Sequence, residues 1–222
     1  MTKSPAAAIC AIAMLASTQA FAGEPVNQSP LHAAAGQGNL PALERLIAEG
    51  AQIDARDATG STALLVAVRA NKVDAARALI EAGADVNAKD GINDSAYLYA
   101  GARGHLEILK LTLAHGADLR STNRYGGTAL IPAAERGHVE TVQTLIEAGV
   151  AVDHVNNLGW TALLEAVILG NGGLRHQQIV KLLLQAGANP NLADREGVTS
   201  LEHARARGYH PIEAMLVAAG GR

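Results

Sequence analysis

The sequence has a single cysteine and few aromatic residues. The cysteine is Cys10, and phenylalanine, tryptophan and tyrosine together make up 3% of the chain. The chain after Cys10 contains no cysteine, so disulfide bonds, thiol catalysis and thiolate metal sites are excluded for that part of the protein. Because alanine, leucine and glycine are plentiful where aromatic residues are scarce, the composition favours short helices packed through small side chains. We expect an all-α fold.

Long runs of lysine and arginine are also lacking, and the formal net charge is only −3. A protein that follows a phosphate backbone needs a basic patch or stripe. Nucleic acid is therefore not expected as a partner. Hydrophobic residues make up 49% of the chain, which is enough apolar material for a folded protein.

The first residues have the pattern of an export signal. Lys3 gives a positive start, the apolar run AAAICAIAMLA follows, and Ala20-Phe21-Ala22 supplies a small-x-small pattern before Gly23. We predict a signal peptide over residues 1–22 that is cleaved after its last residue. The apolar run is too short to cross the ~30 Å hydrocarbon core of a bilayer, so no membrane attachment is expected after cleavage.

An alanine-rich signal and a product without cysteine are typical of a bacterial periplasmic protein, and the periplasm is the expected location. Cys10 lies too early in the apolar run to be the lipid-modified cysteine of a lipoprotein. Secretion is the alternative. In a eukaryotic secretory route Asn27-Gln28-Ser29 and Asn93-Asp94-Ser95 would be candidate glycosylation sites.

Two landmarks recur along the chain with a period of 33 residues. Hydroxyl-bearing residues are one landmark: Ser29, Thr62, Ser95, Thr128 and Thr161. Glycines are the other: Gly50, Gly83, Gly116 and Gly149. The next pair, Thr199 and Gly187, each follow after 38 residues, so a five-residue insertion lies between Thr161 and Gly187. It falls in the stretch GNGGLRH, which we expect to be a loop extension.

Each repeat has the pattern of two short helices and an extended turn. The hydroxyl is placed to cap a first helix such as 62–68, and a polar break such as 103–105 leads into a second helix such as 106–114. The recurring glycine then ends the second helix. Asp57, Asp90 and Asp194 begin the turns, where a short carboxylate can bond to nearby backbone. One such unit cannot bury its apolar face alone, so the units must stack.

Ser29-Pro30-Leu31-His32-Ala33-Ala34 resembles the TPLHxA signature of the ankyrin-repeat family, and variants follow at 128–130 and 161–163. The resemblance implies an all-α solenoid of about six stacked helix-turn-helix units with extended turns. It covers almost all of residues 24–222 as one domain. The predicted units are 24–56, 57–89, 90–122, 123–155, 156–193 with the insertion, and a cap at 194–222.

No residue pattern in the chain indicates catalysis. No GxSxG elbow accompanies the serines, and GNGG lacks the lysine and hydroxyl of a phosphate-binding loop. His105, His138 and His176 stand just before second helices, where capping or hydrogen bonding between repeats is a better explanation than metal binding. We expect no enzymatic activity, no cofactor and no metal site.

The resemblance implies that a protein partner contacts the turn tips and the exposed side of the first helices, which line a concave surface. At these positions most residues are small or polar. Apolar exceptions and nearby arginines have the composition of an interface hot spot, and we expect the apolar ones to form one patch. The candidate partner-binding residues are Ile92, Tyr125, Leu158, Trp160, Ile168, Leu169, Arg69, Arg103 and Arg136.

Trp160 provides the most specific test of this patch. The equivalent residues in the other units range from polar side chains to glycine, so no common packing pocket could accept all of them. We therefore expect it to face outwards. The alternative is that Trp160 and Tyr125 fold back onto neighbouring turns and stabilise the solenoid. The same region departs from the family pattern, since Pro132 and Glu165 occupy a first-helix position expected to be apolar, and 90–93 lacks the turn glycine.

The sequence therefore predicts a monomeric protein-binding module in an exported compartment. A small-molecule or enzymatic role on the concave surface is one alternative. A secreted effector that acts outside the cell is the other.

Overall fold

The computed structural model describes residues 29–222. The predicted signal peptide and the start of the first predicted unit lie outside the described residues. The described part contains twelve helices. In chain order they are α1 (Pro30–Gln37), α2 (Leu40–Ala48), α3 (Ala63–Arg69), α4 (Val73–Glu81), α5 (Ala96–Arg103), α6 (Leu106–Ala114), α7 (Leu130–Glu135), α8 (Val139–Glu147), α9 (Ala162–Ile168), α10 (Leu174–Gln185), α11 (Ser200–Ala206) and α12 (His210–Ala218).

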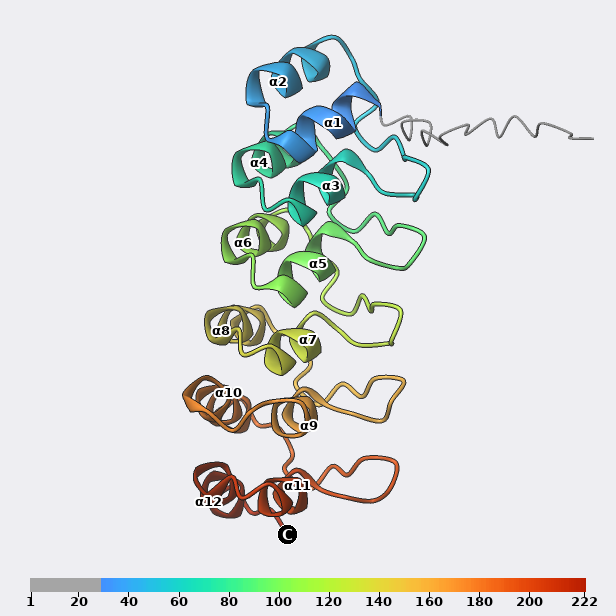
Figure 1. The fold of residues 1–222 in the computed structure, drawn as a ribbon. Helices are drawn as coiled ribbons and strands as arrows, with labels where there is room; N and C mark the ends of the chain where they lie inside the picture. Colours follow the sequence, from blue (N-terminus) through green and yellow to red (C-terminus); the bar gives the residue numbers. More distant parts are fainter. Residues whose placement is uncertain (1–28) are drawn as a thin grey trace, which may run out of the picture.

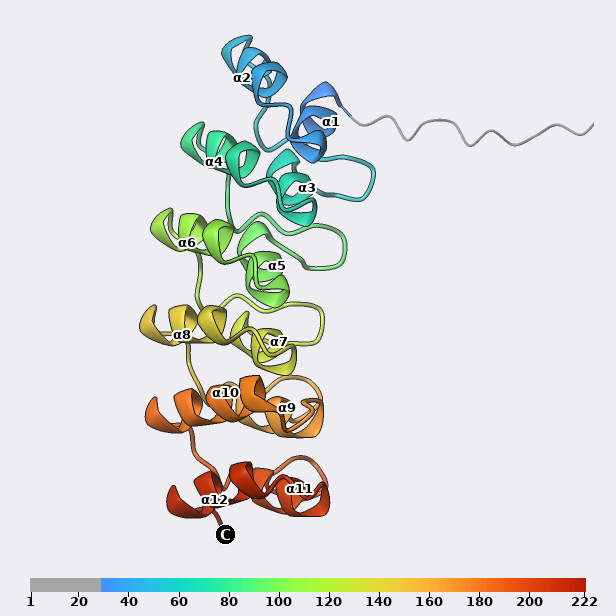
Figure 2. The same ribbon diagram turned by 60° about the vertical axis from the view of Figure 1, so that its left-hand side comes forward.

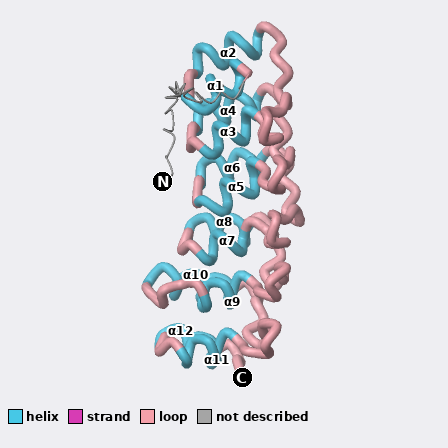
Figure 3. Tube along the Cα trace, turned by 45° about the vertical axis from the view of Figure 1, so that its right-hand side comes forward, coloured by secondary structure: helices cyan, strands magenta, loops and turns pink. Residues whose placement is uncertain are grey.

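The helices form six successive pairs stacked into a column, and long loops project from one side of it (Figure 1). Each first helix packs on the first helices of the neighbouring units, and each second helix packs on second helices. Figure 2 shows that the column bows, with the second helices on its outer side and the first helices with their loops on its inner side. The predicted all-α solenoid is confirmed, and the loops form a continuous row along it (Figure 3).

Hydroxyl caps begin four of the six first helices, as predicted. Thr62, Ser95, Thr161 and Thr199 each accept a hydrogen bond from the backbone N–H three residues ahead. Such a bond satisfies one of the donors that the start of a helix leaves without a partner. Ser29 is different, because its hydroxyl lies 2.6 Å from His32 Nδ1 and makes no cap bond.

The prediction of a cap at Thr128 is wrong, and Pro132 gives the reason. In the neighbouring units the residue four ahead of the cap donates its N–H to the cap carbonyl, as Glu165 does to Thr161 at 3.0 Å. Pro132 has no N–H. The Thr128 carbonyl instead accepts from Ile131 N at 3.3 Å, and α7 begins one residue late. The Thr128 hydroxyl is buried without a partner in the described part of the chain.

The recurring glycine ends the second helices in the predicted way. Gly83 and Gly149 have φ of 91° and 93°, which is the left-handed region that disfavours residues with a Cβ. The turn tips contain a second left-handed position, which Gly60 and Gly126 occupy with φ of 79° and 72°, and which Asn93 occupies with φ of 63° in the turn that has no glycine there. Asparagine tolerates this region better than most residues, so the turn keeps its shape.

The insertion is only partly a loop extension. The helix α10 has 12 residues, whereas the other second helices have 9, so three inserted residues lengthen the helix. The segment that follows Gly173 contains no glycine or proline to stop a helix, which explains the added turn.

A continuous apolar core runs between the two rows of helices. Its largest fully buried side chains are mostly leucine and isoleucine, among them Leu64, Leu79, Leu109, Leu130 and Leu163. Tyr97, which stands where the repeat has leucine, is also fully buried, and its hydroxyl has no partner among the described residues. Within residues 29–222, no helix combines the length and apolar character needed to cross a membrane.

Candidate functional site

A short side chain at the start of each turn fixes the backbone of the tip. The Oδ1 atom of Asn123 accepts from the backbone N–H of Tyr125 at 2.9 Å and of Gly127 at 3.1 Å. Asp57, Asp90, Asn156 and Asp194 make the same pair of bonds in their units. The predicted structural role of Asp57, Asp90 and Asp194 is confirmed. The turn tips are thus rigid supports for the side chains that they carry.

A groove of about 250 Å³ lies on the inner side of the column, over units three to five. The turns of these units and the helices α5, α7 and α9 form it. Its lining residues are Asp94, Tyr99, Ala102, Arg103, Asn123, Arg124, Tyr125, Gly127, Ile131, Pro132, Glu135, Arg136, Asn156, Leu158, Glu165 and Leu169.

Aromatic and aliphatic side chains form the walls of the groove. Tyr125, Leu158 and Leu169 are large hydrophobic residues that remain about half exposed, at 53%, 47% and 50%. The guanidinium of Arg124 lies 4.9 Å from the centre of the Tyr125 ring, and that of Arg103 lies 5.5 Å from the centre of the Tyr99 ring. These cation–π contacts place two guanidiniums over the rings and leave aromatic and cationic surface side by side.

Ion pairs neutralise part of the charge at the rim. Arg124 Nη1 lies 3.8 Å from Asp94 Oδ2, and Arg136 Nη2 lies 3.9 Å from Glu135 Oε2. Burial and the nearby Asp90 carboxylate raise the pKa of Asp94, which Arg124 partly offsets. Arg136 is also fixed by donating from Nη1 to the Ala102 carbonyl at 2.6 Å. Both arginine side chains remain exposed and both pairs are long, so these ion pairs contribute little to stability and a bound partner could replace them.

Glu165 projects from α9 into the floor of the groove. The residue is 6% exposed, and its Oε1 accepts a hydrogen bond from Asn156 Nδ2 at 2.8 Å. Burial, and to a lesser extent the Glu135 carboxylate, raise the pKa of Glu165 to about 7, although the Asn156 bond and Arg136 oppose the change. A carboxyl group that changes charge near neutral pH thus lies beneath the aromatic walls.

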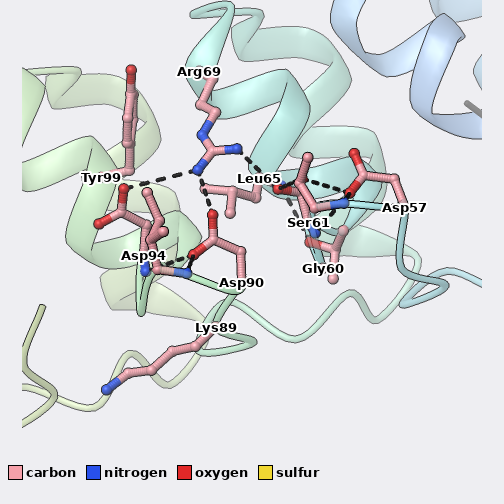
Figure 4. Close-up of polar contacts among 12 residues, drawn as sticks. Asp57, Gly60, Ser61, Leu65, Arg69, Lys89, Asp90, Asp94 and Tyr99 are labelled. Atoms are coloured by element: carbon pink, nitrogen blue, oxygen red, sulfur yellow. Dashed lines mark hydrogen bonds and ion pairs between the residues drawn. The ribbon is translucent and has the colours of Figure 1, made fainter. Parts of the chain in front are cut away.

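Arg69 lies outside the groove lining and joins units two and three (Figure 4). It donates from Nη1 to Ser61 Oγ at 2.9 Å and from Nη2 to the buried Asp90 carboxylate, with Asp94 Oδ2 at 3.8 Å. Burial acts to raise the pKa of Asp90, but backbone bonds from Asp94 and Ile92 and the Arg69 guanidinium outweigh it, so the pKa is lowered. The contacts of Arg69 connect two repeats.

The structure brings five of the nine predicted partner-binding residues together in the groove: Tyr125, Leu158, Leu169, Arg103 and Arg136. The other four lie outside its lining. Ile92 is exposed at a turn tip, Arg69 is bound as described above, and Trp160 and Ile168 are half-buried. The groove lining therefore contains only part of the predicted set, and the single patch stays a prediction.

Sequence reasoning did not include Tyr99, Arg124 and Glu165 among the site residues, although all three line the groove. A usable signal existed for two of them. The position four residues after the hydroxyl landmark is Ala33 and Val66 in the first two units, then Tyr99, Pro132 and Glu165 in the groove units. The change from small apolar residues at this helix position begins at the first groove unit and continues to His203 in unit six, so it indicates the groove without fixing its far end.

Two of the three histidines predicted to connect repeats do so. His105 Nδ1 lies 3.0 Å from the Val68 carbonyl, and His176 Nε2 lies 2.9 Å from the Glu135 carbonyl, each in the preceding unit. His138 makes no side-chain cap bond to α8. Between residues 29 and 222, no group of three or more histidine, cysteine, aspartate or glutamate side chains comes together as a metal site would require.

Comparison with known proteins identifies relatives of this chain. A family model described as ankyrin repeats in three copies matches residues 7–90 and 97–194. The putative ankyrin repeat protein YahD of Escherichia coli (strain K12) is 52% identical over 56 residues, which is 25% of this chain and 28% of the length of YahD.

Solved structures match over most of the chain. An ankyrin repeat domain from Acinetobacter baumannii AYE has a TM-score of 0.85 and 68% identity over 87% of this chain and 98% of that one. The ankyrin repeat protein EF0377 has a TM-score of 0.82 and 43% identity, again over 87% and 98%. The ankyrin repeat domain of Bcl-3, a member of the IkappaB protein family, has a TM-score of 0.79 and 34% identity over 89% of each chain.

Proposed function

Because the chain belongs to the ankyrin-repeat family, we propose that it is a protein-binding module that holds a partner protein in the groove over units three to five. Ankyrin-repeat domains are generally protein-binding modules and are usually not enzymes. The proposal adds to this the surface that is used, and it rests on the composition of the groove.

The observation that supports the proposal is the cluster of Tyr125, Leu158 and Leu169 beside Arg103 and Arg136 on the concave side. Tyrosine and arginine are enriched at interface hot spots, where they combine a large apolar surface with directional hydrogen bonds. Half-exposed side chains on rigid turns lose little freedom when a partner covers them. The groove is thus preorganised for a protein surface.

The size of the groove favours a protein over a small molecule. Pockets for drug-sized ligands enclose roughly 300–1,000 Å³ and cover most of the ligand. This groove, at about 250 Å³, is smaller and opens along the inner side of the column. It has room for one or two side chains of a partner, while the neighbouring turns supply the remaining contact surface.

Site-specific photocrosslinking in the native cell tests the proposal. A photoreactive phenylalanine analogue replaces Tyr125, and the matched control carries the same analogue at Lys110, which is exposed on the outer helix α6. We expect a defined protein adduct at position 125 that Leu158→Arg abolishes, because a charged and longer side chain would occupy the apolar wall. Adducts of the same protein at both positions, or at position 110 alone, would place the binding surface elsewhere.

We also propose that the protein is exported and acts in the bacterial periplasm, with secretion as the alternative. Lys3, the apolar run and Ala20-Phe21-Ala22 support this, and the relatives from Escherichia coli and Acinetobacter baumannii are bacterial. Sequencing the N-terminus of the protein isolated from its native cell should give Gly23 first. A folded protein that retains Met1 would refute export by cleavage.

A further inference from the structure

The acidic residues of the groove differ in whether a cation accompanies them. Asp94 pairs with Arg124, and Glu135 pairs with Arg136. Glu165 forms no ion pair within residues 29–222, although it is the most deeply buried of the three. Its Oε1 is bonded to Asn156, whereas no described residue donates to Oε2, which is not fully buried. One carboxylate oxygen in the floor of the groove is therefore available to a ligand.

Two other buried carboxylates at the turns have a basic side chain against them. In unit six the equivalent helix position is His203, whose Nε2 lies 2.7 Å from the buried carboxylate of Asp194. Between units two and three, the Arg69 guanidinium is bound to the buried carboxylate of Asp90 (Figure 4). In unit five the turn residue is Asn156, and the carboxylate stands on the helix at Glu165. Unit five therefore has a buried carboxylate, but no described basic side chain lies against it.

An ionised carboxylate that has lost water is strongly stabilised by a cation placed against it, because the attraction acts in a medium of low polarity. The guanidiniums of Arg103 and Arg124 lie over the tyrosine rings at the rim, and Arg136 is bound to the Ala102 carbonyl and beside Glu135. None of these three reaches Glu165. A cation that enters from outside would meet its carboxylate directly.

We infer that the groove selects a segment of the partner protein that carries a basic side chain, arginine or lysine, whose cationic head group pairs with Glu165. This inference rests on the proposed function and adds the chemistry of the partner to it. The aliphatic stem of such a side chain would pack against Tyr125, Leu158 and Leu169. Its head group would complete the pair that unit five lacks.

The charged and titratable groups around Glu165 determine how pH affects the binding of a cation. Of the helices packed on α9, α7 supplies Glu135 and, just beyond its end, Arg136, which act on Glu165 in opposite directions. From α10, His176 is hydrogen-bonded through both ring nitrogens. From α11, His203 is held by Asp194. Since a cation binds the ionised carboxylate, binding should weaken as pH falls through about 7, where burial places the pKa of Glu165.

Two matched probes test the inference on the complete protein. Nα-acetyl-arginine amide carries the cation, and Nα-acetyl-citrulline amide has nearly the same shape without charge. Binding is followed by NMR through the backbone amides of Tyr125 and Leu169 and the labelled Cδ of Glu165. We expect the arginine probe to bind at least tenfold more tightly than citrulline, and about tenfold more weakly at pH 6 than at pH 8.

Glu165→Gln serves as the control variant, because its amide oxygen can keep the bond from Asn156 while the charge is lost. We expect it to fold, to bind both probes equally and to lose the pH dependence. Equal binding of both probes to the unmodified protein, no arginine binding at its solubility limit, or tighter binding of Nα-acetyl-glutamate amide would each overturn the inference. In those cases crosslinking at position 125 would still decide the proposed function separately.

Discussion

At the scale of single residues, Glu165 is where function and stability conflict most clearly. Its pKa is about 7 in the folded protein and about 4.5 in an unfolded chain. Below the unfolded value the group is protonated in both states and costs nothing. As pH rises, the unfolded chain loses the proton first, so the cost to folding grows up to about pH 7 and then stays constant.

Replacing Glu165 by glutamine should therefore stabilise the protein in a pH-dependent manner. The pKa difference corresponds to roughly 3 kcal/mol, so we expect Glu165→Gln to raise the free energy of unfolding by about 1–3 kcal/mol at pH 8. At pH 4 the variant should change it little. Urea denaturation at the two pH values measures both numbers.

Glu44→Gln provides the comparison, because Glu44 is exposed on α2 and should change the unfolding free energy little at either pH. If Glu165→Gln destabilised the protein more at pH 8 than at pH 4, the ionised carboxylate would be part of a favourable network in this site. A residue that costs stability at neutral pH is typical of a binding site, where charge is held ready for a ligand.

At the scale of elements, the helix caps show how one residue alters an otherwise regular repeat. Thr161 caps α9 by accepting from Leu164 N at 3.2 Å, whereas the buried Thr128 hydroxyl at the start of the α7 unit has no partner within residues 29–222. The difference follows from Pro132, which cannot donate to the Thr128 carbonyl. The two threonines occupy equivalent positions in adjacent units, so they form a matched pair.

Thr161→Val should cost about 0.5–2 kcal/mol of stability, because it removes the cap. Thr128→Val should be neutral or stabilising, since it removes a buried hydroxyl that has no partner and keeps the shape of the side chain. Chemical denaturation of the two variants provides the measurement. Equal losses in both would show that Thr128 caps α7 after all.

At the scale of the whole molecule, stability is distributed along the column, because each unit packs only on its neighbours. Unit four lies at the middle and supplies much of the groove. Its Leu130 is fully buried between the first helices. A defect there weakens the contact of unit four with units three and five together.

Leu130→Ala should therefore cost about 2–5 kcal/mol through the cavity it leaves. Unfolding should begin in unit four, and amide hydrogen exchange should show faster opening in α7 and α8 than in α3 and α4. Leu158→Ala is the comparison, because Leu158 is half exposed at a turn and should have a small effect on stability. An unchanged melting temperature for Leu130→Ala would contradict the assigned register of the repeat.

The repeat and its class were determined by the sequence itself, because its landmarks depend on local chemistry. A hydroxyl at a helix start and a glycine at a position with positive φ have the same effect wherever they occur, so a period of 33 residues was enough to predict stacked helix pairs. The family resemblance then predicted which side of the stack a partner would contact.

Only the tertiary structure decided which of the candidate residues meet. Whether Trp160 is half-buried, whether Arg69 is bound by Asp90 and whether Glu165 lacks a cation all depend on which side chains the folded chain brings together, within a unit or between neighbouring units. Burial and pKa are properties of that packed surrounding, since desolvation and opposing charges act through space. A repeat pattern specifies the position of a residue in its unit, whereas stacking determines what it contacts.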